Sequence, residues 1–201
     1  VTSSAVQVCA SPSSTRAINI YGGQLYFSAA STNFHGVSAV GSGLPTTSSQ
    51  TAVNLPGLTA DTTSSVYGFV LLDLNPNVAG VDVAYVCDDR TTAAGGLMKY
   101  SLVNNTWVSN GSIQSSVGLR GITAVKTCSS VSIVVSAETG IFSLIDASGY
   151  NQAITGSLTQ LVTSATNEKF RGISFAPGTS TGGLTATVSS SNNVTCFGSA
   201  N

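Results

Sequence analysis

The pentapeptide Arg120-Gly121-Ile122-Thr123-Ala124 decides the fold, because its pattern recurs along the chain. The pattern is a large polar or aromatic residue, then a small residue, then alternating apolar residues. Successive copies begin at intervals of 51, 53 and 51 residues. They are RAINI at 16–20, YGFVL at 67–71, RGITA at 120–124 and RGISF at 171–175. A regular period of this length indicates a repeat architecture.

Further strand-like segments follow each copy in the same order. They are rich in β-branched and aromatic residues and are separated by Gly, Pro, Asn and Ser, which is typical of strands joined by turns. The second segments are 24–28, 82–86, 131–135 and 184–188, the third are 37–40, 97–100, 141–144 and 194–197, and the fourth are 51–55, 106–109 and 159–162. No segment keeps the apolar period of a helix.

Four strands in a repeat of about 51 residues is the period of a β-propeller blade. The sequence therefore predicts an all-β chain, with residues 1–201 forming one β-propeller domain or an arc of one. Its four blade units would start near residues 16, 67, 120 and 171. A β-sandwich outside the propeller class is the alternative.

The two ends of the chain suggest how the ring closes. Residues 4–8 (SAVQV) precede a unit start by the same distance as the fourth segment at 159, and the last unit lacks a fourth segment. We therefore expect residues 1–15 to hold a displaced fourth strand. This strand either completes the last blade and closes a four-bladed ring, or the chain is an arc that a second chain or another copy completes.

The composition is unusually poor in charge. Only 7% of the 201 residues are charged and the net charge is −1, whereas 32 are Ser and 24 are Thr. Without a basic stripe to neutralise phosphates, a role in binding nucleic acid is excluded. No apolar run is long enough to insert into a membrane as a helix. A mean hydropathy of +0.29 argues against disorder.

Several features together predict a secreted, extracellular glycoprotein. The chain starts at Val1 and its only methionine is Met98, which indicates a mature product from which an N-terminal segment was removed. Sequons at Asn104, Asn110 and Asn193 offer glycosylation sites. Four cysteines in such a chain suggest disulfides, for which three pairings exist.

Of these pairings, we favour Cys9 with Cys196 and Cys87 with Cys128. Ring closure would make Cys9 and Cys196 neighbours, because one follows the displaced fourth strand and the other lies on a third strand of the last unit. Cys87 and Cys128 are then paired by elimination.

The candidate site lies where the blade starts meet the ends of the second strands. In a blade these two places share one face, so several charged residues should gather at one mouth of the channel. Cross-blade ion pairs would explain such a ring, and a bound polar ligand is the alternative. The residues are Arg16, Tyr67, Asp88, Asp89, Arg120, Glu138 and Arg171.

Catalytic signatures are weak, so we predict no catalytic residue. The single histidine, His35, has no acidic neighbour in the sequence, and no nucleophile elbow occurs. Paired carboxylates of a glycosidase remain a third interpretation.

One loop resembles the start of a calcium site, and no other cofactor is predicted. Asp73, Asn75, Asn77 and Asp82 place oxygen ligands at alternate positions. Val78 stands where such a loop needs Gly, and the distal Glu is missing. An Asn-Pro turn without metal is the alternative.

Several strings resemble a family of secreted, largely uncharacterised β-propeller proteins. The resemblance covers most of residues 16–177, matches the C-terminal part of longer family members, and so implies an arc. The four cysteines depart from the family pattern, and the resemblance implies no catalytic residues. The strings are GGQLY at 22–26, VGSGLPTT at 40–47, DLNP at 73–76 with GVD at 80–82, KYSLV at 99–103 and FRGISFAP at 170–177.

The predicted function is therefore a non-catalytic binding module. Its lectin-like ligand would be a carbohydrate, bound by the charged ring or by loop aromatics such as Tyr21, Trp107 and Tyr150. A structural coat or matrix component that assembles through propeller edges is the alternative, and a glycoside-processing enzyme is the third.

Overall fold

The structure, a computed structural model, describes residues 5–12, 14–31, 33–58, 61–92 and 95–176. These residues form twelve strands and no helix. Accordingly, they contain no helix that is long and apolar enough to span a membrane.

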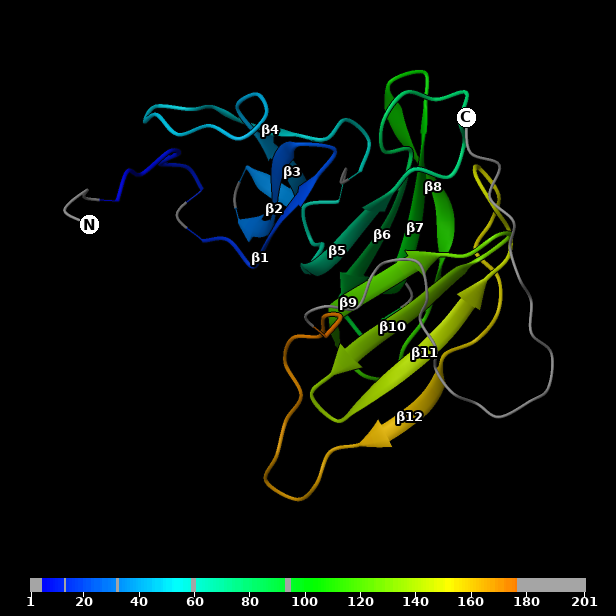
Figure 1. Ribbon diagram of the computed structural model, residues 1–201. Coiled ribbons are helices and arrows are strands. Elements are labelled where there is room, and N and C mark those ends of the chain that lie inside the picture. The colour runs from blue at the N-terminus through cyan, green and yellow to red at the C-terminus, as the bar shows by residue number, and fades with distance from the viewer. Residues whose placement is uncertain (1–4, 13, 32, 59–60, 93–94, 177–201) are drawn as a thin grey trace.

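The strands form three antiparallel sheets of four, and in each sheet the spatial order of the strands is their order in the chain (Figure 1). The first sheet holds β1 (Ala17–Tyr21), β2 (Gln24–Ser31), β3 (Phe34–Val40) and β4 (Ala52–Asn54). The second sheet holds β5 (Val66–Leu72), β6 (Val83–Asp88), β7 (Gly96–Val103) and β8 (Thr106–Ile113). The third sheet holds β9 (Leu119–Lys126), β10 (Val131–Ala137), β11 (Gly140–Asp146) and β12 (Thr159–Thr163).

The prediction of an all-β chain made of four-stranded units is thus confirmed. The described residues hold three such sheets, rather than the four predicted units. Residues 171–176 of the fourth unit form no strand, and its later predicted strands lie outside the described residues.

The prediction of a displaced N-terminal strand is wrong for its described part. Residues 5–8 form no strand, and Val8 accepts a backbone hydrogen bond from Gln50 at 2.8 Å. Val8 and Cys9 pack against buried side chains of the first sheet. The segment therefore lies over its own first unit, because Val8 and Cys9 find apolar partners there.

Consecutive sheets pack through their first strands, β1, β5 and β9. Phe69 and Leu71 on β5 are buried in a cluster with Val37 of the first sheet. Val70, between them, is buried in a cluster with Ile133 of the third sheet. Side chains alternate in this way because successive residues of a strand point to opposite faces.

The glycine at the second position of the second and third units allows close contact with the start of the next unit. A Cβ on Gly68 would lie 2.8 Å from the Arg120 carbonyl oxygen, and a Cβ on Gly121 would lie 3.0 Å from that of Arg171. The backbone of the next unit therefore occupies the space a larger side chain would need. This explains the small residue in the repeated pattern.

A hydrogen-bonding side chain recurs at one position of the second strands. Ser28 donates to the Tyr67 carbonyl, the Cys87 thiol to the Gly121 carbonyl at 3.6 Å, and Ser136 to the Arg171 carbonyl at 2.9 Å. Each bond joins one sheet to the start of the next unit.

Both predicted disulfide pairings are wrong. Cys9 and Cys87 are free thiols, so neither pair forms as predicted, whereas Cys128 takes part in a disulfide. Cys196 lies outside the described residues. Cys87 contacts Gly121 at one end of β9, whereas Cys128 follows the other end of that strand. Seven residues of extended chain span about 23 Å, far beyond the reach of a disulfide.

Candidate functional site

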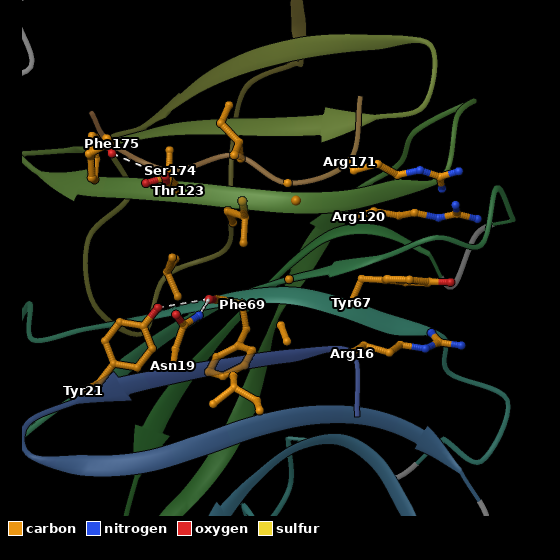
Figure 2. A pocket seen from close by; sticks show the side chains of 18 residues that line it. Arg16, Asn19, Tyr21, Tyr67, Phe69, Arg120, Thr123, Arg171, Ser174 and Phe175 are labelled. Carbon is orange, nitrogen blue, oxygen red and sulfur yellow. Dashed lines mark hydrogen bonds between the residues drawn. The ribbon is translucent and has the colours of Figure 1, made fainter. Parts of the chain in front are cut away.

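The first residues of the four units form a single row along one edge of the packed first strands. Figure 2 shows Arg16, Tyr67, Arg120 and Arg171 in this order, with their side chains extending in the same direction. The guanidinium carbon of Arg16 lies 4.0 Å from the centre of the Tyr67 ring, and that of Arg120 lies 4.9 Å from it. Tyr67 is therefore held by cation–π contacts with both arginines. We call these four residues the arginine row.

Two carboxylates hold one side of the arginine row in place. Asp89 accepts from Arg120 at 3.1 Å, and Glu138 also accepts from Arg120. Glu138 receives a further bond from Arg171 at 2.7 Å and one from Lys169. These bonds link the second unit, the third unit and the start of the fourth.

The sequence-based prediction placed this cluster well, with two differences. Asp88 does not join it: its carboxylate is fully buried and binds Arg90 at 2.8 Å and the Ser65 amide at 2.9 Å. Lys169 does join it and was not predicted. Its position two residues before the fourth unit start is the signal in the sequence that marks it.

Arg16 differs from the other cations of the row. It donates to the Ser65 hydroxyl at 2.9 Å and to the Val66 carbonyl at 3.1 Å. Its guanidinium has no acidic partner among the residues that the structure describes. Four cations, Arg16, Arg120, Lys169 and Arg171, therefore face two acids, so the cluster is positive although the whole chain carries −1.

Glu138 is ionised at neutral pH. The hydrogen bond from Lys169, together with the charges of Lys169, Arg171 and Arg120, lowers the pKa of this carboxyl. A glycosidase acid needs the opposite shift, because it must hold a proton near neutral pH.

An open groove of about 570 Å³ runs beside the arginine row. It is lined by residues at the start of all four units, including the small residues Gly68, Gly121 and Gly172. Figure 2 shows Tyr21 and Asn19 at the end of the groove away from the arginines, both bonded to the Phe69 carbonyl oxygen. Burial raises the pKa of Tyr21 to about 12, so it stays a neutral donor. The groove is thus charged along one side and nearly uncharged along the rest.

The three aromatic residues proposed as sugar platforms each have partners within the protein. Trp107 is buried in the core between the first two sheets. Tyr150 is partly buried and donates to the Leu102 carbonyl at 2.6 Å. Tyr21 packs against the rings of Tyr26 and Phe69. These contacts give the three side chains structural roles, and an aromatic sugar site stays an untested prediction.

The calcium-like loop has an explanation without metal. The Asp82 side chain is buried and its two oxygens accept from the amides of Leu74 and Asn75, at 2.8 and 2.7 Å. Asn75 caps the amide of Asn77 at 3.1 Å, and the Asp73 carbonyl accepts from Lys126. Within the described ranges no group of three or more His, Cys, Asp or Glu residues suits a metal ion. Calcium binding here stays an untested prediction.

Two of the three sequons can be placed. Asn104 is exposed in the turn between β7 and β8. Asn110 is partly buried, and its amide nitrogen lies 3.4 Å from the Asn151 oxygen. Asn193 lies outside the described residues. Asn104 therefore offers the more accessible acceptor of the two.

A buried ion pair between the second and third sheets was missed by the sequence reasoning. Lys99 on β7 and Asp146 at the end of β11 are 2.8 Å apart, and both side chains are fully buried. Tyr85 donates to Asp146 at 2.6 Å, and Lys99 also donates to the Ser148 hydroxyl. The signal in the sequence is a lone charge inside the apolar segment of β7. The pair faces the interior and is not part of the groove.

In comparisons with protein-family models, curated proteins and solved structures, none matches this chain. The fold and the arginine row therefore carry the functional argument. They define an all-β protein of stacked four-stranded sheets with a positive cluster along the start of its units.

Proposed function

We propose that this chain is part of a secreted β-propeller and acts as a non-catalytic binding module for an acidic glycan. The arginine row carries this proposal, because its three arginines together with Lys169 place four cations against two acids beside an open groove. The stacking of sheets through first strands supports a propeller arc, and the composition and sequons support secretion.

The chemistry of the row suits carboxylate or sulfate groups. A guanidinium binds such groups through two parallel hydrogen bonds, which gives both strength and geometry. Tyr67 holds Arg16 and Arg120 by their faces, which leaves their planes less free to rotate. Holding these cations in place before binding lowers the entropy cost of binding.

Binding is favoured over hydrolysis by the state of the carboxylates. Asp89 and Glu138 both accept from the same guanidinium, that of Arg120. The lowered pKa of Glu138 disfavours a role as general acid. A neutral sugar is also a poorer match, because Tyr67 uses its ring to contact arginines.

Substitution of Arg16 and Arg171 tests the proposal, since both side chains are exposed and removing them should not unfold the chain. We expect Arg16→Ala and Arg171→Ala each to weaken binding of dextran sulfate about tenfold, or 1.4 kcal/mol. Isothermal titration calorimetry at low salt measures this, with neutral dextran as the ligand control.

The matched control is Lys126→Ala, which removes an exposed cation that contacts the Asp73 carbonyl instead of the row. It should leave dextran sulfate affinity unchanged. Equal binding of neutral dextran, or equal losses in all three variants, would contradict an arginine-row site.

Glu138→Gln should have the opposite effect. The substitution removes the acid that competes for Lys169, Arg171 and Arg120. Each exposed pair is weak, so we expect dextran sulfate affinity to rise by up to about fivefold at neutral pH. Asp73→Asn, which makes the same charge change away from the row, is the control. It should change the dextran sulfate affinity by less than about twofold, because distant exposed charges are screened by salt.

Acidification should act in the same direction as Glu138→Gln. The folded pKa of Glu138 is below its ordinary value of 4.5, so its ion pairs persist above pH 4.5 and are lost as the pH falls through the folded pKa. Dextran sulfate stays ionised at this low pH. The affinity of the wild-type chain should therefore rise on acidification by more than that of Glu138→Gln, which has no carboxyl to protonate at this position. An identical rise in both proteins would show that Glu138 does not restrain the row.

A structural coat or matrix role is the second candidate function. The observation that favours it is an uncovered apolar strip along β1 of the first sheet, described next.

A further inference from the structure

Each first strand presents its third and fifth residues to the preceding sheet. In the second unit these residues, Phe69 and Leu71, are 1% and 2% exposed. Ile122 of the third unit is 8% exposed. In the first unit, however, Ile18 and Ile20 are 63% and 56% exposed. The same residue type at the same place is therefore covered in later units and uncovered in the first.

The rest of this face is already covered. Phe27, Ala29 and Val40 are buried, with Val8 and Cys9 of the N-terminal segment packed against them. The uncovered part is thus a strip along β1, which is the part that another first strand contacts in the later units. We call Ile18 and Ile20 the open strip.

The opposite end of the row has the complementary feature. A Cβ on Gly68 would lie 3.1 Å from the Ile122 side chain, and one on Gly121 would lie 3.3 Å from the Ile173 side chain. Among the residues that the structure describes, a Cβ on Gly172 would meet nothing within 4 Å. Each of the two contacts pairs a glycine of one unit with an isoleucine of the next unit. Gly172 lacks such an isoleucine, and Ile18 lacks such a glycine.

The two open halves do not meet within the described residues. Figure 2 shows Arg16 and Arg171 at opposite ends of the arginine row, with Tyr67 and Arg120 between them. A head-to-tail contact between two molecules would bring Gly172 of one against Ile18 of the other. Its geometry would be that of the Gly68–Ile122 and Gly121–Ile173 contacts inside the chain.

We propose that a second copy of this chain covers the open strip, with Gly172 of one copy against Ile18 of the other. A head-to-tail contact that recurs at both ends closes a ring of two copies. The contact buries Ile18 and Ile20, and it extends the arginine row from Arg171 of one copy to Arg16 of the next. Apolar burial drives the association, because the strip itself carries no charge.

The test is the native mass of the purified chain, measured by sedimentation velocity and light scattering at micromolar concentrations. We expect twice the chain mass of 20.2 kDa. Ile18→Asp places a charge in the contact, and Gly172→Leu fills the space that the partner strand needs. Each should weaken the dimer at least about tenfold and yield monomer with unchanged circular dichroism.

Val53→Asp is the matched control, because Val53 is 59% exposed on β4 of the same sheet and lies off the strip. It should leave the dimer intact. A wild-type chain that stays monomeric would overturn the proposal, as would a dimer that neither Ile18→Asp nor Gly172→Leu weakens. A monomer that Ile18→Asp strongly destabilises would show instead that the chain covers its own strip.

Two further results would also count against a second copy. Co-purification of a different polypeptide that Ile18→Asp releases would identify another partner, and open-ended polymers would exclude the closed ring. The inference stands apart from the glycan proposal, since Val53→Asp and Ile18→Asp leave every residue of the arginine row in place.

Discussion

Asp146→Asn is expected to lower the free energy of unfolding by about 3–5 kcal/mol, because it leaves the Lys99 ammonium buried without a counter-ion. Both side chains are fully buried, and they join β7 of the second sheet to β11 of the third. For a chain of this length the melting temperature should fall by roughly 10 °C. Urea unfolding followed by circular dichroism measures the change.

Two further variants test whether the loss of stability in Asp146→Asn comes from the unpaired charge of Lys99 or from altered packing. Replacing the whole network with apolar groups, as in Tyr85→Phe with Lys99→Met and Asp146→Leu, should recover most of the loss, because no buried charge remains. Lys126→Met removes an exposed lysine and should cost less than about 0.5 kcal/mol. A loss in Asp146→Asn no larger than that of Lys126→Met would mean that the Lys99–Asp146 pair is solvated.

The same pair predicts a pH dependence. Burial alone would raise the pKa of Asp146, but hydrogen bonds from Lys99, Ser148 and Tyr85 outweigh it and lower the pKa below the ordinary value of 3.8. The stabilisation is therefore complete above pH 3.8 and is lost as the pH falls through the lower folded value. Asp146→Asn should lack this component of the acid transition.

The repeat made most of the fold predictable from the sequence. A period near 51 residues located β1, β5 and β9, because each begins at or next to a large polar or aromatic residue followed by a small one. The sequence shows that the second residue of each unit is small. Only the structure shows the reason at Gly68, which is the nearby Arg120 carbonyl of the next unit. The displaced strand was misplaced because a segment as short as residues 4–8 has no register of its own, so tertiary contacts of Val8 decided its position.

The candidate site was predictable to a similar extent. Asp89, Arg120 and Glu138 meet because unit starts and second-strand ends share one face, which topology alone dictates. Asp88 is the neighbour of Asp89 in the chain, yet it is buried and bonded to Arg90 and to the Ser65 amide, partners that the position in the repeat does not reveal. The predicted pairing of Cys87 with Cys128 was wrong because it ignored the length of β9. Cys87 lies beside one end of this strand and Cys128 follows the other end.

Gly68→Ala is expected to destabilise the chain by about 1–3 kcal/mol, although it adds one methyl group to a strand. The new Cβ would lie 2.8 Å from the Arg120 carbonyl oxygen and 3.1 Å from the Ile122 amide nitrogen. Both are backbone atoms, so no side chain can rotate away and the first strands β5 and β9 must separate. Urea unfolding should show the loss.

The control uses the same residue at the same position of another unit. No atom of the described residues lies within 4 Å of a Cβ built on Gly172, so Gly172→Ala should change stability by less than about 0.5 kcal/mol. Because Gly172 takes part in the proposed contact between copies, both substitutions are compared in the monomeric Ile18→Asp background. Equal stabilities for the two variants would show that β5 and β9 are not in contact at Gly68.

Gly68→Ala also connects the packing of first strands to the arginine row. Tyr67 precedes Gly68, and its ring contacts both Arg16 and Arg120. Separating β5 from β9 would move Tyr67 away from Arg120, so dextran sulfate affinity should fall together with stability. A loss of stability with unchanged affinity would mean that Arg16 and Arg171 bind the ligand without the support of the stacked tyrosine.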